Sequence, residues 1–466
     1  MLIPAPEIFK AYDIRGIVDK TLTRDSVHAI GCAIGSEARE RNAGAIVVAR
    51  DGRLSSPALA RSLADGLRAS GADVVDIGMT PTPLAYFAAH HLKTGSAVMI
   101  TGSHNPPEYN GFKIMLGGET LHSGAIAALR ERIVEGRLAS GSGKLSRVDV
   151  REAYFKRIVD DVKLARPMKI AVDCGNGVAG AFAPELFRRM GCELVELFCA
   201  VDGAFPNHHP DPSKPANLQD LIRALRETDA ELGLAFDGDG DRLGVVTKDG
   251  EIIYPDRQLM LFAADVLMRH PGAQIIYDVK CSRNLARSIR YQGGEPLMWM
   301  TGHALIKAKL KETGAPLAGE MSGHTFFNER WYGFDDGLYA GARLLEIVSR
   351  WQPEQGGANW PLKHLPDAIS TPELNLKMKE GEPHALIAKL RETAKFKGAR
   401  EIIAIDGLRV EYPDGFGLMR ASNTTPVLVL RFEADNKTAL ARIQADFRRV
   451  LKAARPDLPL TFKGDA

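Results

Sequence analysis

The sequence predicts an α/β protein with three similar mixed α/β sheet domains followed by a C-terminal α+β domain. Its 466 residues exceed what one hydrophobic core usually holds, so three or four domains of roughly 100–150 residues are expected. Strand-like and helix-like segments alternate through the first two thirds of the chain. The last part instead places strands between two helices, which is typical of an α+β domain.

The first unit begins with a buried strand at residues 44–49, which ends in the charged run RDGR at 50–53. The run Ser55-Ser56-Pro57 marks the start of a helix that reaches about Ser70, because serine and a first-turn proline are common there. The remaining elements predicted for this unit are strands at residues 72–77 and 96–100.

The same order of elements restarts twice. Each restart begins with a strand that ends in a carboxylate, Asp173 or Asp278, just as Asp51 follows the first strand. We therefore expect an internal structural repeat, although the residues of the three units are only weakly similar. The predicted elements are a strand at 168–173, a helix at 179–190 and a strand at 193–198, then a strand at 273–278, a helix at 283–291 and a strand at 297–300.

The C-terminal part begins after residues 361–372, which carry three prolines and little periodicity and are predicted to form a linker. Beyond it we predict a helix at 383–393, strands at 401–412 and 427–432, and an amphipathic helix at 437–454. The domain boundaries predicted from this organisation are 1–148, 149–251, 252–364 and 365–466.

The composition is that of an ordinary globular protein, with 45% hydrophobic and 25% charged residues. A net charge of +2 indicates no surface dedicated to nucleic acid or a membrane, but allows a local basic pocket. No signal peptide is recognised, and no run approaches the ~18 apolar residues of a membrane span. The five scattered cysteines, without a C-x-x-C pair, argue against a disulfide framework and indicate a reducing compartment. We expect a cytoplasmic protein.

The acidic run DGDGDR at 237–242 follows a predicted strand and is the most specific local signal. Asp237, Asp239 and Asp241 alternate with glycines, so a tight loop can turn three oxygen ligands toward one cation, and such ligands suit Mg²⁺. An EF-hand loop is excluded, because Arg242 replaces the sixth-position glycine and Lys248 the twelfth-position glutamate. A solvated acidic turn stays the alternative.

The strand at 96–100 runs into TGSHNP, a turn that places Ser103 between Gly102 and His104. Gly, Ser, Asn and Pro are ordinary turn residues, so one interpretation is simply a strand end. The other interpretation makes Ser103 a nucleophile, for which the rest of the chain has to supply a metal and cations.

Further polar loops follow later strands. RASNTTP at 420–426 combines an arginine with three hydroxyls and turn N–H groups, which suits a phosphate, although polar turns are common. Glu320 and Ser322 are expected to face the same side of an extended loop, where they could bind neighbouring sugar hydroxyls. His303, His324 and Lys280 are each as compatible with a structural as with a functional role.

Four motifs together resemble those of the α-D-phosphohexomutase family, specifically its bacterial phosphomannomutase/phosphoglucomutase branch. They are TGSHNP, DGDGDR, GEMSGH and RASNTTP, which occur here in the family's order. The resemblance extends from Ala11 to Asp435. It implies four domains around a central active-site cleft, in agreement with the organisation described above.

The resemblance also implies roles for individual residues. Ser103 would carry a phosphate, and Mg²⁺ would sit among that phosphate, Asp237, Asp239 and Asp241. Arg15, Lys113 and Arg242 would be the surrounding cations, and Lys113, His104 and His324 are candidates for general acid or base. The residues that would bind the sugar or the second phosphate are Tyr12, Lys280, Gly302, His303, Glu320, Ser322, Arg420, Ser422, Asn423 and Thr424.

The implied reaction is reversible phosphoryl exchange between C1 and C6 of glucose or mannose phosphates, through a hexose 1,6-bisphosphate (glucose 1,6-bisphosphate for glucose). We expect a monomer with a small-molecule sugar phosphate as its partner. A phosphoglucosamine mutase is the nearest alternative, but Met321 and Gly102 favour the hexose branch. Two further alternatives are a non-catalytic sugar-phosphate-binding paralogue and a metal-dependent phosphatase. The paralogue is disfavoured, because such a protein could lose the serine or a metal aspartate, whereas this sequence keeps them all.

Overall fold

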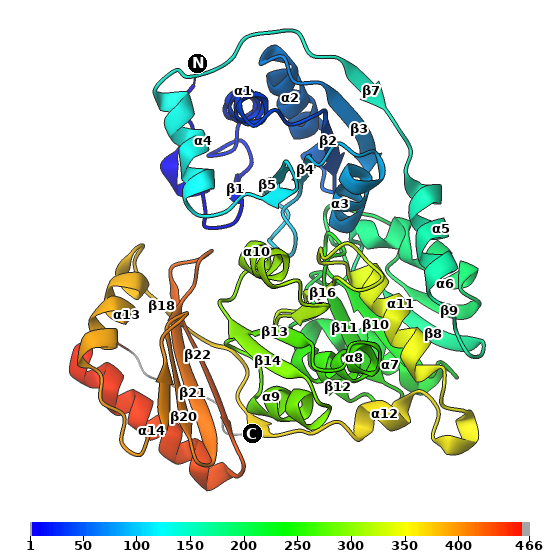
Figure 1. Ribbon diagram of the computed structural model, residues 1–466, viewed down its shortest axis with the longest axis vertical. Coiled ribbons are helices and arrows are strands. Elements are labelled where there is room, and N and C mark those ends of the chain that lie inside the picture. Colours follow the sequence, from blue (N-terminus) through cyan, green and yellow to red (C-terminus); the bar gives the residue numbers. More distant parts are fainter. Residues whose placement is uncertain (1, 459–466) are drawn as a thin grey trace.

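The computed structural model describes residues 2–458 and folds into four β-sheets, which form from successive parts of the chain (Figure 1). The first sheet has the strand order β1-β5-β4-β2-β3-β7, with β6 beside β5. Its strands are β1 (Ile14–Ile17), β2 (Ile46–Arg50), β3 (Val74–Met79), β4 (Ala97–Ile100), β5 (Tyr109–Leu116), β6 (Glu119–Thr120) and β7 (Leu145–Arg147). The helices of this part are α1 (Arg24–Glu40), α2 (Ser56–Ala69), α3 (Thr82–His91) and α4 (Gly124–Val134), after a short 3-10 turn at Pro6–Ile8.

The second sheet has the order β12-β11-β10-β8-β9 and the third the order β14-β13-β15-β16. The second comprises β8 (Met168–Asp173), β9 (Cys192–Leu197), β10 (Leu232–Phe236), β11 (Leu243–Thr247) and β12 (Ile252–Ile253), with α5 (Arg151–Asp161), α6 (Ala183–Arg189) and α7 (Gln219–Glu227). The third comprises β13 (Gln274–Asp278), β14 (Glu295–Trp299), β15 (Leu317–Gly319) and β16 (Thr325–Phe327), with α8 (Pro255–Arg269), α9 (Arg283–Tyr291), α10 (His303–Thr313) and α11 (Gly337–Val348).

These three sheets share one topology, which confirms the predicted repeat. The first strand of each repeat, β2, β8 or β13, lies between two parallel strands. Of these two neighbours, the one that comes later in the chain also pairs with an antiparallel strand on its other side. The turn before that antiparallel strand is 101–108 in the first sheet, 237–242 in the second and 320–324 in the third. Three of the four motifs therefore occupy the same position in three copies of one sheet.

The fourth sheet is antiparallel throughout, with the order β17-β22-β21-β20-β19 and β18 beside β22. Figure 1 shows α13 and α14 on its outer face. This confirms the predicted α+β domain. Its elements are β17 (Ile369–Ser370), β18 (Leu374–Lys377), β19 (Glu401–Ile403), β20 (Leu408–Tyr412), β21 (Gly415–Ala421), β22 (Val427–Ala434), α13 (Glu382–Thr393) and α14 (Lys437–Ala454).

Buried helices and buried arginines join the sheets to one another. Every residue of α11 is buried, and this helix packs against both β11 of the second sheet and β16 of the third. Arg409 of the fourth sheet donates to the carbonyls of Val279 and Cys281 at 2.6 Å, and Arg431 donates to Lys280 O at 2.5 Å. The loop after β13 is thus held against the fourth sheet. Among residues 2–458, no helix is long and apolar enough to cross a membrane.

Two local predictions differ from the structure, and one strand lacks a prediction. The supposed linker contains α12 (Asn359–Lys363), with Pro361 inside it, and the short strand β17. The helix predicted at 179–190 is a 3-10 turn (Val178–Ala181) followed by α6, because Pro184 has no N–H and starts a new helix. The strand β21 was not predicted because glycine weakens strand signals. Gly417 within it lies against a ring: an added Cβ would stand 2.4 Å from Phe447 Cε2.

Candidate active site

Ser103 lies in the turn that follows β4, with a φ of +48°, in the left-handed region that few non-glycine residues adopt. Its side chain is buried. Ser103 Oγ donates a hydrogen bond to Asp237 Oδ2 at 3.1 Å and lies 3.1 Å from His104 Nδ1. The Ser103 hydroxyl, at the end of a strand of the first sheet, therefore faces the acidic loop of the second sheet. A serine that is to carry a phosphate beside a metal site would need this placement.

A buried arginine that sequence reasoning missed holds this turn. Arg53 donates to the backbone carbonyls of Ser103 at 2.8 Å and of Asn105 at 2.6 Å. It also donates to the carbonyl of Pro106 in the same turn and to that of Tyr109 at the start of β5. Asp51 Oδ2 lies 3.2 Å from Arg53 Nε and accepts the Gly102 N–H at 3.3 Å. The signal in the sequence was the RDGR run, since opposite charges at the end of a buried strand are rarely left unpaired.

The acidic loop is built by hydrogen bonds to its own backbone. Asp237 Oδ1 accepts the N–H groups of Asp241 at 3.1 Å and Arg242 at 3.2 Å. Gly238 allows the serine turn to approach, because a Cβ there would lie 2.3 Å from Ser103 O. The three aspartates are completely buried, so their carboxylates can lie this close only with cations nearby.

The three carboxylates fit a divalent cation. One oxygen from each of Asp237, Asp239 and Asp241 lies within 4.8 Å of the others. Asp239 Oδ1 and Asp241 Oδ1 are buried without a hydrogen-bond partner within residues 2–458. Buried carboxylate oxygens are rarely left unpaired, and an oxygen-lined site of this kind suits a hard cation such as Mg²⁺.

Lys113 supplies the opposing charge in this structure. Its Nζ lies 2.7 Å from Asp239 Oδ2 and also donates to Asp241. Burial by itself lowers the Lys113 pKa, but the two carboxylates outweigh it and raise that pKa well above its ordinary value. Burial likewise favours a protonated Asp239, yet the ammonium holds the Asp239 pKa below its usual range. Lys113 is therefore charged while it pairs with these carboxylates.

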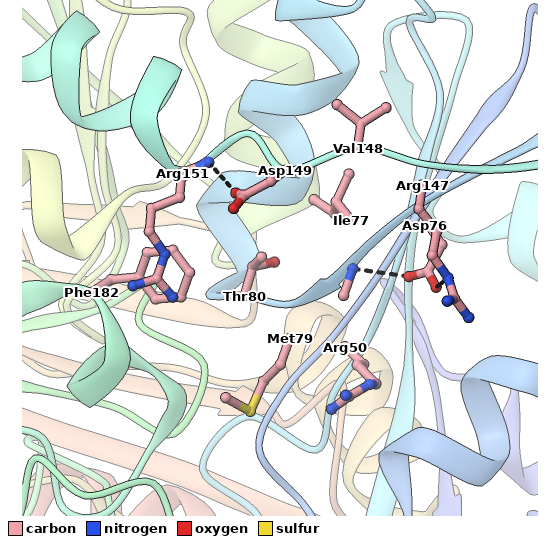
Figure 2. A pocket seen from close by; sticks show the side chains of 11 residues that line it. Arg50, Asp76, Ile77, Met79, Thr80, Arg147, Val148, Asp149, Arg151 and Phe182 are labelled. Atoms are coloured by element: carbon pink, nitrogen blue, oxygen red, sulfur yellow. Dashed lines mark hydrogen bonds and ion pairs between the residues drawn. The ribbon is translucent and has the colours of Figure 1, made fainter.

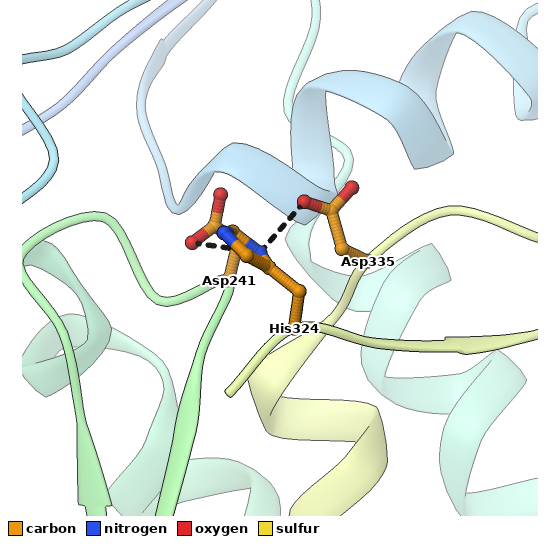
Figure 3. Close-up of side chains that lie close together, drawn as sticks. All are labelled: Asp241, His324 and Asp335. Atoms are coloured by element: carbon orange, nitrogen blue, oxygen red, sulfur yellow. Dashed lines mark ion pairs between the residues drawn. The ribbon is translucent and has the colours of Figure 1, made fainter. Parts of the chain in front are cut away.

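Arg242 and His324 extend the site from the second sheet to the third. Arg242 Nε donates to His324 Nε2 at 3.1 Å, so Nε2 is an acceptor and the ring proton lies on Nδ1. That nitrogen points to Asp335, with Oδ2 at 3.0 Å, and stands 3.6 Å from Asp241 Oδ1 (Figure 3). Asp335 also accepts from Lys307 Nζ at 2.9 Å. Sequence reasoning missed Asp335, which follows an aromatic stretch without a motif.

His303, Glu320 and Tyr12 lie next along this path. The His303 ring centroid is 5.7 Å from that of His324 and 6.0 Å from that of Tyr12. Burial lowers the pKa of His303 well below its ordinary value, which keeps the imidazole neutral. Glu320 accepts the Gly302 N–H and, at 3.3 Å, the Ser322 hydroxyl. The extended loop expected for the last pair is instead a tight turn, closed by a Gly323 N–H to Glu320 O bond of 3.0 Å.

The RASNTTP loop is the hairpin between β21 and β22. Arg420 Nε pairs with Asp406 Oδ2 at 2.9 Å, while its Nη2 is buried with no hydrogen-bond partner in the described part of the chain. The Asn423 amide donates to the Tyr12 hydroxyl, which itself donates to Thr301 O at 3.1 Å. A cavity of about 420 Å³ adjoins this junction. Residues from three parts of the chain line it, among them Tyr12 near the first sheet, Met300 near the third and Asn423 in the fourth-sheet loop.

The structure thus brings most of the predicted site residues into one line of contacts. It runs from Ser103 through Asp237, Arg242 and His324 to His303, Tyr12 and Asn423. Arg15 joins the serine end by donating to Asn105. Lys280 stands aside, because its Nζ pairs with Glu373 Oε1 at 2.7 Å. In the last loop, the Ser422 hydroxyl lies 3.4 Å from the Thr424 hydroxyl and 3.2 Å from the Thr425 hydroxyl.

Comparisons with known proteins agree with this architecture. Family models described as phosphoglucomutase/phosphomannomutase alpha/beta/alpha domains I, II and III and C-terminal domain match residues 6–138, 152–250, 254–357 and 373–450. A phosphomannomutase/phosphoglucomutase of Pseudomonas aeruginosa is 57% identical over 99% of this chain and 98% of its own length. A phosphoglucomutase of Neisseria meningitidis is 59% identical over 96% of this chain and 97% of its own.

A solved structure is similar over the whole chain. The crystal structure of a phosphoglucomutase/phosphomannomutase family protein from Burkholderia thailandensis has 62% sequence identity and a TM-score of 0.93. The match covers 98% of this chain and 100% of that one.

Proposed function

Because the chain belongs to the phosphoglucomutase/phosphomannomutase family, we propose that it moves a phosphoryl group reversibly between C1 and C6 of hexose phosphates. One observation carries the proposal. The Ser103 hydroxyl lies 3.1 Å from Asp237 of the acidic loop, and the contacts that begin there end at the loop of Arg420 and Asn423. A phosphoryl donor and a second phosphate site therefore face one continuous site.

Ser103 carries the phosphoryl group in the resting enzyme. A free hydroxyl of the bound hexose phosphate attacks phosphorus, the bond from phosphorus to Ser103 Oγ breaks, and a hexose 1,6-bisphosphate forms. After the bisphosphate has reversed its orientation, Ser103 Oγ attacks its other phosphorus and the sugar oxygen leaves. The phosphoserine is thereby restored, and no phosphate is lost to water.

The charges around Ser103 suit this transfer. Asp237, Asp239 and Asp241 would hold Mg²⁺, which, when bound, neutralises charge on the transferred phosphoryl group. Lys113, Arg15 and Arg242 supply further positive charge.

The proton of the attacking hydroxyl needs a neutral acceptor. Lys113 fits that role only if it leaves Asp239 and Asp241, because these carboxylates raise its pKa above the ordinary value. Burial lowers the pKa of His104 well below its ordinary value, so its imidazole is neutral, whereas the acceptor nitrogen of His324, Nε2, is engaged by the Arg242 N–H. His104 therefore fits the role of general base, and His324 fits it once Arg242 turns from the ring to the substrate.

The remaining loops bind the part of the substrate that does not react. Arg420 offers a buried guanidinium nitrogen to the second phosphate, with Ser422, Asn423 and Thr424 completing the cradle. Glu320 and Ser322 bind ring hydroxyls, and Tyr12, Gly302 and His303 line the path between the two phosphates, whereas Lys280 would have to leave Glu373 to reach it. Since either end of the sugar must fit each position, we infer that both glucose and mannose phosphates are accepted.

The decisive experiment replaces the nucleophile. The Ser103→Ala variant should lose at least about 10⁴-fold in turnover of glucose 1-phosphate in a coupled assay primed with glucose 1,6-bisphosphate. It should still bind glucose 6-phosphate within a few fold of wild type in calorimetry. Substantial activity in this variant would refute the nucleophile. Release of inorganic phosphate at the rate of sugar turnover would instead indicate a phosphatase. A preference for glucosamine phosphates would indicate a phosphoglucosamine mutase.

A further inference from the structure

A second cavity, of about 500 Å³, lies between the first sheet and the start of the second part of the chain. None of its lining residues belongs to the site described above. Figure 2 shows it bounded by Arg50 and Met79 at the ends of β2 and β3, by residues 147–151, and by Phe182. The carboxyl ends of parallel strands are where open α/β sheets commonly bind ligands.

Two polar groups on its wall lack partners. The Arg50 side chain is half-buried, and its guanidinium makes no hydrogen bond or ion pair with any described residue. Thr80 is 4% exposed, and its hydroxyl is buried without a hydrogen-bond partner in the same part of the chain. A buried hydroxyl is seldom left unsatisfied, so an unpaired hydroxyl and an unpaired arginine that line the same cavity indicate a ligand that accepts hydrogen bonds.

The rest of the wall is partly apolar and carries charges of both signs, with Arg147 and Arg151 among the cations and Asp76 and Asp149 as the anions. Arg151 stacks on the Phe182 ring at 4.2 Å from its centroid, and its Nη1 donates to Ala181 O at 3.1 Å and lies 3.5 Å from Glu185 Oε2. A planar guanidinium held in this way can stack a flat group on its second face. Arg147 lies at the rim, with its Nε 3.5 Å from Asp76 Oδ2. Ile77, Met79 and Val148 supply hydrocarbon surface between the charged groups (Figure 2). A free sugar would leave this apolar surface unused, and inorganic phosphate would fill only a small part of the cavity.

Short connections link the cavity to the serine and acidic loops. Arg50 precedes Asp51, which accepts the Gly102 N–H and pairs with Arg53. The Thr80 N–H donates to Arg50 O at 2.9 Å, and two residues later Thr82 Oγ1 donates to Asp239 Oδ2 at 2.5 Å. A ligand that draws on Arg50 and Thr80 therefore acts directly on the residues that hold both loops.

We propose that this cavity is an effector site for an organic phosphate of nucleotide type. Its phosphates are bound by Arg50 and the Thr80 hydroxyl, and its ring lies on the exposed face of Arg151. Binding adjusts the turn of Ser103 and thereby changes turnover. The inference is independent of which hexose phosphate the catalytic site prefers.

Calorimetry of the full-length protein with ADP tests the site, with saturating glucose 6-phosphate present so that ADP is kept out of the catalytic cleft. We expect one binding site for ADP. Arg50→Gln and Thr80→Val should each weaken binding at least about tenfold, whereas Arg61→Gln, an exposed arginine on α2, should leave it within about twofold. Because Arg50 is only half-buried, its variant should keep the melting temperature of wild type, which circular dichroism checks.

Two further arms identify the ligand class. Adenosine and inorganic phosphate should each bind at least about tenfold more weakly than ADP, because each offers only half of the complementary groups. ADP should also change kcat of wild type by at least about twofold, and Arg50→Gln should abolish this response. The proposal is overturned if wild type does not bind ADP or if Arg50→Gln binds it as tightly. An equal affinity for inorganic phosphate, or an unchanged kcat, would equally overturn it.

Discussion

Lys113 Nζ lies 2.7 Å from Asp239 Oδ2 and also contacts Asp241, so one buried ammonium pairs with two of the three carboxylates of the acidic loop. The same two side chains carry the oxygens that have no hydrogen-bond partner among the described residues. Lys113 and a metal ion therefore act on the same carboxylates, and the two cations repel each other across a short, buried distance.

Replacing Lys113 by glutamine should thus have opposite effects on metal binding and on catalysis. The affinity for Mg²⁺ should rise at least about tenfold, because the competing charge is gone. Turnover should fall at least about 100-fold, because a cation near the transferred phosphoryl group is lost. Calorimetry with MgCl₂ on chelator-treated protein and a coupled mutase assay measure the two. Lys389→Gln, on the exposed face of α13, is the control, and unchanged or weaker Mg²⁺ binding in the Lys113 variant would contradict the argument.

Arg53 provides a test of how the serine turn is held. An Arg53→Lys variant keeps the charge opposite Asp51 but cannot donate to four carbonyls from one ammonium group. We expect the free energy of unfolding to fall by about 3 kcal/mol, since buried acceptors are left unpaired. The turnover should fall about 10- to 100-fold, because a displaced nucleophile reacts less often. Urea denaturation and the coupled assay measure these, with Arg61→Lys as the exposed control.

Much of the fold was predictable because its signals are local. The strand Met168–Asp173 and the helices Arg283–Tyr291 and Lys437–Ala454 begin and end where hydrophobic periodicity predicts. Repeated strand-to-carboxylate patterns likewise indicated the threefold repeat. Predictions of individual elements failed where packing between distant residues decides the structure. In β21, for example, the ring of Phe447 fills the space that a side chain at Gly417 would need.

The missed site residues share a different cause. Arg53 acts on a turn 50 residues away. Likewise, Tyr12 and Asn423 were both predicted as site residues, but the contact of the Tyr12 hydroxyl with the Asn423 amide, 411 residues away, was not. Such contacts depend on how separate sheets are placed, which no spacing along the chain records. Asp335 is the same case, because its role becomes visible only when His324 and Lys307 converge on it.

Asp336, the N-cap of α11, should make stability depend on pH. Burial raises its pKa from the ordinary value of 3.8 to about 7, even though Tyr154 and the Tyr339 N–H donate to it. The folded state therefore binds a proton more tightly than the unfolded state. This contribution to stability is complete below about pH 4, is lost as the pH rises to about 7, and is constant above that.

Asp336→Asn removes this dependence and keeps the cap, because asparagine is an equally good N-cap. The melting temperature of the variant minus that of wild type should increase from pH 5 to pH 7 by several degrees and then level off. Differential scanning calorimetry at half-unit pH steps would show it. A difference that is flat over this range, or one that declines with rising pH, would mean that Asp336 is ionised throughout.

Arg420 offers the sharpest test of the second phosphate site. Its Nε is engaged by Asp406, and its buried Nη2 is left for a ligand. A lysine there has one ammonium, which cannot both pair with Asp406 and reach the phosphate that Nη2 would hold. Arg420→Lys should raise KM for glucose 1-phosphate and mannose 1-phosphate by about 10- to 100-fold, with kcat changed much less, because this phosphate is bound equally in ground and transition states. Arg400→Lys, an exposed arginine before β19, should leave both parameters at wild-type values. If kcat fell as far as kcat/KM while KM stayed constant, Arg420 would act on the reacting phosphate, and the two ends of the site would have to be exchanged.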